Sequence, residues 1–508
     1  MSETRIGDRL HHFPGGLKLR HHKKISCEQA LARPDLPEVL HVPLGRDRRS
    51  SGQLLVAPGD IVSKGQPLTV AEDDLEVTVH APTSGRIGEL TERAASWPPG
   101  RRNPCLALIP DGRDAWLDPE ALEEWLEVEP GILIDHLRAM GLTGLGGAMF
   151  PTAAKLRGDW PSIDTLILNG AECEPWISCD EMLMRTAPEK VIRGALVLAR
   201  ALGAGEIVVG IEDQMNTVAS RLNAARSRVA GGDAVRVVKV TTIYPEGGER
   251  QLIQVLTGRE VPHDGLPQDI GVVCHNVATA AAAHDAVIEG RPVVERIVTV
   301  TGPGVAQPCN LIALIGTTIA HLLEAAGGLS DDTRRLILGG PMSGVALSSD
   351  QVPVSKGTNC LLALVDRQFE DARTTLPCIN CGECVRVCPA SLLPQTLFKA
   401  VAAEQWQQAA ELHLSDCIEC GCCAQVCPSH IPLVDWYRHG KGELEIKKLD
   451  ERRAALARRR HEARERRLKS EQAEREARRE RRRQKLEAPE KARDEIRAAI
   501  ERARSKKQ

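Results

Sequence analysis

Eight cysteines toward the C-terminal end of the chain constrain its folding more than any other feature of the sequence. They form two runs of the same spacing, Cys-x2-Cys-x2-Cys-x3-Cys, and a proline follows each run. A [4Fe–4S] cluster needs four thiolates. A tight loop with two-residue gaps presents three of them to one cluster, and the fourth cysteine ligates the other cluster. The sequence therefore predicts two [4Fe–4S] clusters, with the metal ligands Cys378, Cys381, Cys384, Cys388, Cys417, Cys420, Cys423 and Cys427.

This spacing assigns Cys427 to the cluster of the first run and Cys388 to the cluster of the second. Cys422 does not keep the spacing and is expected to be a non-ligand. Two zinc sites of four cysteines each are the alternative, but zinc ribbons pair two Cys-x2-Cys units instead of repeating a four-cysteine run. Two neighbouring clusters pass single electrons, so the rest of the chain should hold the electron source or sink.

Length and charge limit the remaining possibilities. A chain of 508 residues predicts about three domains of ordinary size, and a net charge of −3 does not favour a nucleic-acid partner. Residues 441–508 differ from the rest, with 26 Lys and Arg against 15 Asp and Glu. This charged tail is expected to be a solvated, salt-bridged helix or to be disordered.

The sequence shows no apolar signal segment at its N-terminus and no run of about 18 apolar residues that could span a membrane. We therefore expect no transmembrane segment. In the cytosol, the 16 cysteines are expected to be ligands or thiols instead of disulfides.

The N-terminal quarter reads as short strands separated by Gly and Pro turns. This pattern, assigned to residues 1–125, resembles the barrel-sandwich hybrid fold of biotinyl and lipoyl carriers. Such carriers need a lysine at the hairpin tip, where this chain has Glu72, Asp73 and Asp74. The region is therefore predicted to be a structural module.

Alternating helices and strands predict an α/β domain with a largely parallel sheet over 130–290. Pro188 and Gly203 mark the start and end of one helix, and the strand 206–211 follows it. A smaller unit over 292–350 is expected to contain an apolar helix at 311–324. The cysteine motifs occupy 365–440 and the charged tail 441–508.

A glycine-rich loop in the α/β domain suggests a phosphate-bearing ligand. Backbone N–H groups of such a loop can approach a phosphate at a helix start, and a lysine adds positive charge. The loop follows a helix, so it is not the Rossmann fingerprint. Downstream, a buried strand ends in polar groups, where α/β folds place ligands. The loop contains Gly144, Gly146, Gly147, Phe150 and Lys155, and the strand end contains Asn169, Glu172 and Glu174.

These segments resemble the flavin- and NADH-binding subunit of respiratory complex I. In that family a glycine-rich loop runs into Phe-Pro-Thr and a lysine, an Asn-x-x-Glu-x-Glu-Pro strand end follows, and later comes Asn-Val-x-Thr. This chain matches with residues 144–155, 169–175 and 276–279. It departs from the pattern at Ala171, where the family has an acidic residue.

The order of modules over residues 1–440 resembles the RnfC family, which belongs to the Rnf (Rsx) ion-translocating electron transport complex. The resemblance implies a multidomain α/β and α+β protein. Its modules would be a barrel-sandwich hybrid, a Rossmann-like FMN/NADH domain, a β-grasp (SLBB) domain and a two-cluster bacterial-ferredoxin-like domain. A charged helical or disordered tail would follow.

The same resemblance implies site roles. Gly144, Gly146, Gly147 and Lys155 would hold the phosphate and ring edge of FMN. Glu172 and Glu174 would be the catalytic residues, with Phe150 and Glu174 facing the incoming NAD(H). The side chains lining the flavin would be Asn169, Glu172, Asn276 and Thr279, with Glu212 close by.

A flavin accepts two electrons with a hydride and releases them singly, which suits one-electron clusters. The expected function is therefore electron passage between NAD(H), FMN and the clusters, in a membrane-bound translocase complex coupled to ion movement. The resemblance implies a peripheral position on the cytoplasmic face of the bacterial inner membrane. It also implies as partners the other subunits of the Rnf complex and ferredoxin. Two alternatives are a cluster-bearing adaptor without a working flavin site and a soluble diaphorase-type subunit of another dehydrogenase.

Overall fold

The computed structural model describes residues 6–45, 52–95, 102–158, 160, 162–365 and 374–506. The chain forms two compact units, Met1–Tyr437 and Arg438–Gln508. In the described part of the first unit, strands form three larger sheets and one two-stranded sheet. The first unit contains all of the predicted site residues.

Short antiparallel strands near the N-terminus form a small β module, as the glycine and proline turns predict. Along β1, Leu40 and Val42 are buried and alternate with half-buried residues, and they pack with Leu106 and Leu108 of β6. This period of two is the pattern of a sheet with one covered face. The strands are β1 (Leu40–Pro43), β3 (Ile61–Val62), β5 (Gly85–Ala94) and β6 (Arg102–Pro110) in one sheet and β2 (Gln53–Leu54) and β4 (Thr69–Val70) in the other.

A four-stranded parallel sheet forms the centre of the predicted α/β domain. Its order is β10 (Val272–Asn276), β7 (Thr165–Gly170), β8 (Glu206–Glu212) and β9 (Val235–Val240). Because all four strands are parallel, their carboxyl ends lie at one edge of the sheet. The polar residues that follow them are therefore brought together.

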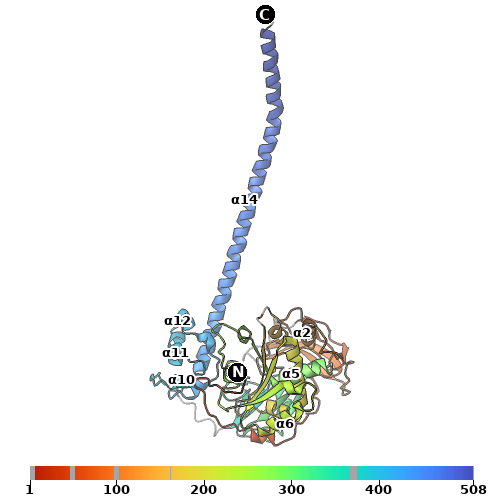
Figure 1. Ribbon diagram of the computed structural model, residues 1–508, viewed down its shortest axis with the longest axis vertical. Coiled ribbons are helices and arrows are strands. Elements are labelled where there is room, and N and C mark those ends of the chain that lie inside the picture. Colours follow the sequence, from red (N-terminus) through yellow and green to blue (C-terminus); the bar gives the residue numbers. More distant parts are fainter. Residues whose placement is uncertain are drawn as a thin grey trace, which may run out of the picture. The chain divides into compact units, whose positions relative to one another are not determined.

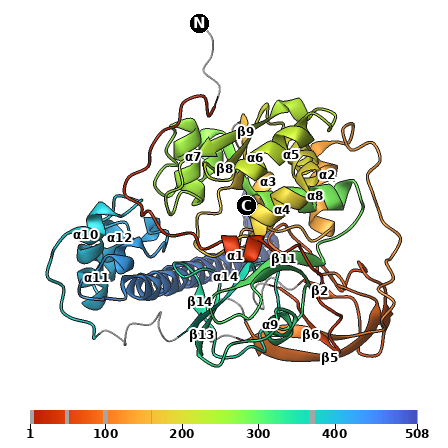
Figure 2. The same ribbon diagram turned by 90° about the horizontal axis from the view of Figure 1, so that it is seen from below.

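Helices cover both faces of this sheet, as Figure 2 shows. Leu166 and Leu168 of β7 face one core with α5 and α8, while Ile167 faces a second core with α7. Gly194 lets α5 approach α8, since a Cβ there would lie 1.7 Å from a backbone oxygen of α8. The helices are α2 (Pro130–Ala139), α3 (Thr152–Leu156), α4 (Cys179–Thr186), α5 (Pro188–Leu202), α6 (Asn216–Arg226), α7 (Glu249–Thr257) and α8 (Val277–Val287).

The next module is a five-stranded sheet, and here the helix predicted at 311–324 was wrong. Leu311–Leu314 belong to a strand that pairs with β11, and only Ile319–Ala325 form a helix, α9. A continuous apolar run cannot distinguish a buried strand from a buried helix. The sheet also takes up β15, which lies beyond 350. Its strands are β11 (Glu295–Thr301), β12 (Cys309–Leu314), β13 (Thr333–Leu338), β14 (Val345–Ala346) and β15 (Cys360–Val365).

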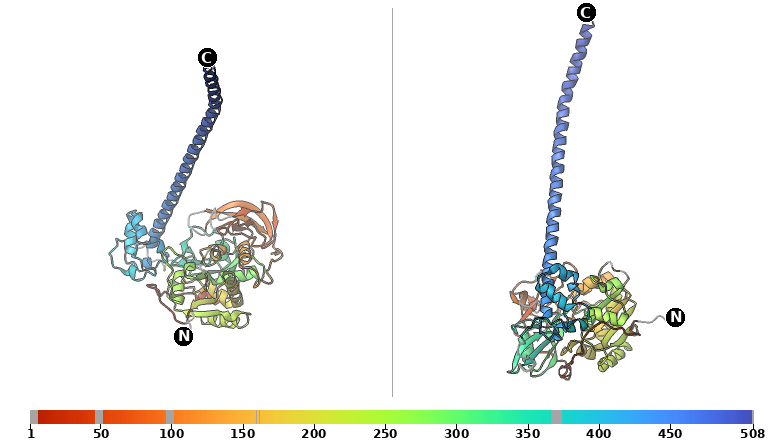
Figure 3. Two further views of the ribbon diagram at one scale, coloured as in Figure 1. Left: turned by 45° about the horizontal axis from the view of Figure 1, so that its top comes forward. Right: turned by 90° about the vertical axis from the view of Figure 1, so that its left-hand side faces the viewer.

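The cysteine-rich segment folds as a small group of short helices, drawn in light blue in Figures 1 and 3. These are α10 (Glu383–Arg386), α11 (Pro394–Ala402), α12 (Trp406–Glu411) and α13 (Cys422–Gln425). The final helix, α14 (Leu433–Ser505), contains the charged tail, so of the two predicted states of the tail the helical one is found. Among the described residues, no helix combines the length and apolar character needed to cross a membrane.

The N-terminal segment before β1 runs along several modules of the first unit. Gly7 donates its N–H to Leu256, and Leu17 pairs with Tyr244. The short helix α1 (Lys24–Cys27) follows, and Ala32 then pairs with Leu311 of the five-stranded sheet. The segment therefore passes the carboxyl edge of the parallel sheet on its way to the β module.

Candidate functional site

The two cysteine loops have the same backbone conformation at matched positions. Each loop has a left-handed residue two positions after its first cysteine and a left-handed glycine after its second, and a further left-handed residue follows each Cys-Pro pair by two positions. Alternation of left- and right-handed residues turns successive N–H groups inward, which suits the sulfurs of a cluster. The matched pairs are Asn380 and Glu419, Gly382 and Gly421, and Ser391 and His430.

The fold brings together the four cysteines that the spacing assigned to the second cluster. Cys388, Cys417, Cys420 and Cys423 line one pocket, whose other walls include apolar side chains and Tyr437. One of these cysteines comes from the first run and three come from the second. The donor set and the apolar surroundings therefore fit a [4Fe–4S] cluster with crossed ligation.

The other four cysteines follow the same rule. Leu376 donates its N–H to Ser429 (2.9 Å), and the Ser429 hydroxyl donates to the Pro377 carbonyl (2.9 Å). These bonds tie the chain before Cys378 to the chain after Cys427. Cys422, by contrast, is fully buried against Cys173 and Tyr244 of the flavin-type domain.

The glycine-rich loop packs over the start of α8. Leu145 donates its N–H to the Thr279 hydroxyl (2.9 Å), and a Cβ at Gly146 would lie 3.2 Å from the Asn276 Cβ. Gly147 has a φ of +110°, and no atom lies within 4 Å of the place that a Cβ would take, so its backbone is open to a ligand. The Asn276 side chain caps α8 by accepting from Ala278 (2.8 Å). An open glycine backbone beside a helix start fits a phosphate group.

Side chains from the ends of β7 and β10 meet at the start of α4. Glu172 accepts the N–H groups of Asp180 (3.0 Å) and Glu181 (3.2 Å), and Asn276 donates to Asp180 (2.6 Å). Asn169 is held at the same edge by its bond to the Gly247 carbonyl (2.8 Å). The predicted flavin-lining residues Asn169, Glu172, Asn276 and Thr279 are therefore fixed at neighbouring positions.

Two buried carboxylates beside them have oxygens without a hydrogen-bond partner in the described part of the chain. These are Oε1 of Glu212, which is fully buried, and Oε2 of Glu246, which is 2% exposed. Burial, together with the charges of Glu212 and Asp213, raises the pKa of Glu246 to about 8. Unsatisfied buried acceptors cost free energy, so they mark a place where donor groups of a ligand fit. The N–H groups and hydroxyls of FMN are such donors.

Lys23 enters this site from the N-terminal segment. Its Nζ lies 3.4 Å from Glu212 Oε2 and 3.9 Å from Glu172 Oε2, and it also donates to the Glu172 carbonyl. Burial lowers the pKa of Lys23, but the carboxylates Glu172 and Glu212 outweigh it, so the pKa lies above its ordinary value. Burial raises the pKa of Glu172 to about 8, against the effect of Lys23. The shorter distance makes Glu212 the main ionised partner of Lys23.

Lys155 and Glu174 have partners inside the chain. Lys155 forms an ion pair with Glu249 and donates to the Cys274 carbonyl (2.6 Å). Glu174 accepts from the N–H groups of Met342 (2.7 Å) and Ser343 (3.0 Å), in a loop of the five-stranded sheet. Glu174 is thus held toward that loop, and it does not share a hydrogen bond with Glu172.

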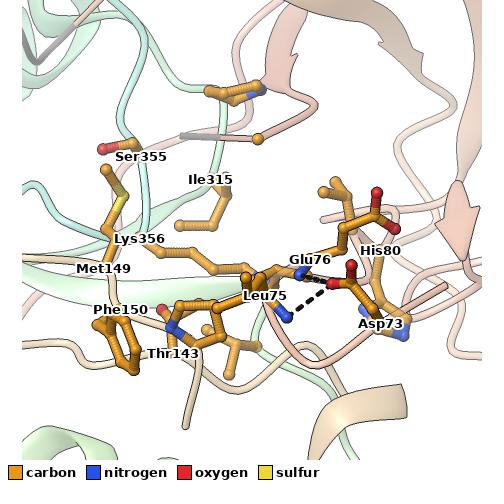
Figure 4. Close-up of a pocket in the computed structure, with 16 residues that line it drawn as sticks. Asp73, Leu75, Glu76, His80, Thr143, Met149, Phe150, Ile315, Ser355 and Lys356 are labelled. Atoms are coloured by element: carbon orange, nitrogen blue, oxygen red, sulfur yellow. Dashed lines mark hydrogen bonds between the residues drawn. The ribbon is translucent and has the colours of Figure 1, made fainter. Parts of the chain in front are cut away.

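Phe150 lines a separate cavity of about 310 Å³, shown in Figure 4. The β module contributes Leu75, Glu76 and His80, and the five-stranded sheet region contributes Ile315 and Lys356. Asp73 accepts from the N–H groups of Leu75 and Glu76 and so shapes the hairpin tip beside the cavity. The tip that carries a cofactor in biotinyl and lipoyl modules here borders a pocket next to the glycine-rich loop.

Burial controls the charges of this cavity. The pKa of Lys356 is lowered to about 7, and that of His80 to about 3, where the charge of Lys356 adds to the effect of burial. The Lys356 ammonium donates to the carbonyls of Gly141 (2.6 Å) and Thr78 (3.2 Å). His80 Nδ1 and the Thr143 hydroxyl have no hydrogen-bond partner among the residues that the structure describes.

Sequence reasoning missed Lys23, Tyr244 and Lys356. Lys23 stands in a run of histidines and lysines that gives no sign of burial, and Lys356 follows no recognisable motif. Tyr244 had a weak signal, since it is one of only two tyrosines in the chain and precedes a Pro-Glu-Gly-Gly turn.

Models of known domain families match four parts of the chain. They are the RnfC barrel sandwich hybrid domain at residues 11–113 and the Nuo51 FMN-binding domain at 137–285. The SLBB domain matches at 297–346 and the 4Fe-4S dicluster domain at 377–431. Together with the site geometry, these matches define the class: a flavin and iron–sulfur protein that combines an FMN-binding domain with two [4Fe–4S] clusters.

Curated relatives give the particular family. RnfC of Pseudomonas aeruginosa, a subunit of its ion-translocating oxidoreductase complex, is 42% identical, and the match covers 98% of this chain and 66% of the relative. The same subunit of Serratia proteamaculans is 40% identical, over 98% of this chain and 70% of the relative. The chain belongs to the RnfC family of the ion-translocating oxidoreductase complex. It spans just under two thirds of the length of the Pseudomonas protein.

A solved chain of an NAD⁺-reducing [NiFe]-hydrogenase in the H2-reduced state is also similar. The sequences are 21% identical, the match covers 61% of this chain and 62% of the hydrogenase chain, and the TM-score is 0.44. A likeness at this score does not establish a common mechanism.

Proposed function

We propose that this chain passes electrons between NAD(H), FMN and its two [4Fe–4S] clusters as a peripheral subunit of a membrane-bound complex. The complex would couple this transfer to ion translocation, as the names of the relatives imply for those proteins. The other subunits of that complex would be its partners, and ferredoxin or a membrane-bound flavin chain would exchange electrons at the opposite end. The proposed location is the cytoplasmic face of the bacterial inner membrane.

The observation that carries this proposal is a direct contact between the FMN-binding domain and a cysteine loop. The Tyr244 hydroxyl donates to the Cys420 carbonyl (2.6 Å), and Cys173 packs with Tyr244 and Cys422. Cys173 stands between Glu172 and Glu174 at the end of β7, and Cys420 is a proposed ligand of the second cluster. The carboxyl edge of the parallel sheet therefore adjoins the cluster to which electrons would pass first.

Each predicted site residue has a proposed role. The open backbone of Gly144, Gly146 and Gly147 would hold the FMN phosphate and ring edge, with Lys155 adding positive charge. Asn169, Glu172, Asn276 and Thr279 would line the flavin, with Glu212 close by. Phe150 and Glu174 would face the nicotinamide dinucleotide, and the cavity beside Phe150 supports an approach from that side.

Bound FMN would supply the chemistry that joins a two-electron donor to one-electron clusters. The residues of the chain have simpler tasks. The cap on α8 and the bonds of Glu172 to the start of α4 fix the polar groups around the flavin. Glu246, with a pKa of about 8, can hold a proton at neutral pH.

Reconstitution of the full chain tests the proposal. The expected result is bound FMN, and bleaching of the cluster absorbance when NADH is added without oxygen. Clusters without FMN, and without reduction by NADH, would favour a cluster-bearing adaptor. Full activity without any binding to the other members of the complex would favour a soluble diaphorase-type subunit.

A further inference from the structure

A buried lysine from outside the FMN-binding domain reaches into its carboxyl edge. Lys23 is 6% exposed, although it lies before the β module and far before the end of β7 in the sequence. Its neighbour Lys24 has a side chain that is 88% exposed and forms an ion pair with Glu28 on the surface. Two adjacent lysines of the same sequence context therefore have opposite environments.

The segment around Lys23 is fixed on both sides, so its ammonium cannot leave the site without breaking other contacts. On the N-terminal side, Trp176 donates its N–H to His21 (2.7 Å), and the ring of His22 stacks on Trp176 at 4.4 Å. On the other side, the hydroxyls of Ser26 and Ser178 are hydrogen-bonded (2.7 Å), and Asn310 donates to the Ser26 carbonyl (2.9 Å).

The position of the ammonium relates it directly to the flavin site. It contacts the carbonyl and carboxylate of Glu172, which follows β7, and the carboxylate of Glu212, which ends β8. The second oxygen of Glu212 has no partner in the described residues, and neither has Oε2 of Glu246. A buried cation beside open acceptors orients those acceptors and sets the electrostatic potential felt by a ligand placed there.

We propose that Lys23 is a positioning residue of the flavin site, which holds Glu212 and Glu172 in place and stabilises the reduced form of FMN. The inference rests on the proposed function. Reduction by a hydride adds two electrons and one proton, so FMN becomes more negative by one charge. A fixed positive charge in a site shielded from water favours the more negative form. The N-terminal segment is then a part of the flavin site.

The test compares Lys23→Met with Lys24→Met in the reconstituted full chain. The readouts are FMN affinity, from flavin fluorescence, and the midpoint potential of bound FMN, from a spectroelectrochemical titration. Lys23→Met should bind oxidised FMN more weakly. It should also lower the preference for reduced over oxidised FMN about tenfold, a shift of about 30 mV to more negative potential for a two-electron couple. Lys24→Met should match the wild type, and Lys23→Arg should retain most of the potential.

Glu212→Gln supplies a second measurement that does not depend on the folding of Lys23→Met. Removing this negative charge should move the potential of FMN in the opposite direction, to more positive values, which damage to the fold alone would not do. An unchanged or more negative potential in Glu212→Gln would overturn the proposal, as would wild-type affinity and potential in Lys23→Met. If the wild-type chain binds no FMN, the proposed function fails instead, so the two failures are distinguishable.

Discussion

The two redox sites of this chain are built in different ways. The cysteine loops are local: within each, three proposed ligands lie in seven residues, and matched left-handed residues repeat the same turn twice. The flavin site is assembled from the glycine-rich loop, the ends of parallel strands, the start of α8 and a lysine from the N-terminal segment. The comparison shows that a repeated local motif reveals its geometry in the sequence, whereas a site made by tertiary contacts does not.

The largest expected effect tests how local the cysteine loops are. Cys388→Ser removes the one proposed ligand of the second cluster that comes from the first run. Iron should fall from about eight to about four atoms per chain, since each cluster holds four. Iron analysis and the visible absorbance measure this loss. Cys422→Ser is the matched control and should keep its iron; if Cys388→Ser also does so, crossed ligation is wrong.

Glu174 tests whether a residue from the predicted strand-end motif belongs to the flavin site or to a contact between modules. Glu174→Gln weakens the bonds to the Met342 and Ser343 amides. It should lower the free energy of unfolding of the first unit by about 1–3 kcal/mol. Denaturant unfolding measures this change, with exposed Glu123→Gln as the control. Unchanged stability with slower reduction by NADH would instead place Glu174 at the dinucleotide.

Asn276 tests the non-local assembly on a smaller scale. Asn276→Ala removes the cap of α8 and the donor to Asp180. It should cost about 1 kcal/mol of stability and weaken FMN binding severalfold. Thermal unfolding and flavin fluorescence measure the two effects, and Asn223→Ala, on the exposed side of α6, should change neither. Wild-type FMN affinity in Asn276→Ala would separate the α8 start from the flavin site.

The smallest expected effect is on the pH dependence of stability. The pKa of Glu246 in the folded chain is about 8, above the ordinary 4.5, because the carboxyl is buried near Glu212 and Asp213. Its contribution to folding is therefore present below about pH 4.5 and is lost as the pH rises through 8. Glu246→Gln should flatten the fall in stability between pH 6 and 9, followed by thermal unfolding. A slope equal to that of the wild type would show that Glu246 does not titrate there.

The sequence predicted the modules and most of the helices and strands because each has local signals. Pro188 and Gly203 bound α5, and the glycine φ of +71° at its end is the expected stop. The apolar run at 311–324 was assigned to a helix because its strand character depends on pairing with β11, which no local pattern records.

By itself, the sequence determined the two cysteine loops, since their ligands, turns and spacing lie within short segments. It also determined the glycine-rich loop and the polar strand ends, because those residues stand beside strong local signals. The tertiary structure alone decided that Lys23 is buried while Lys24 is exposed, and that Glu174 turns toward another module. Burial and charge pairing depend on which distant segments meet, and that is settled only when the sheets and helices pack.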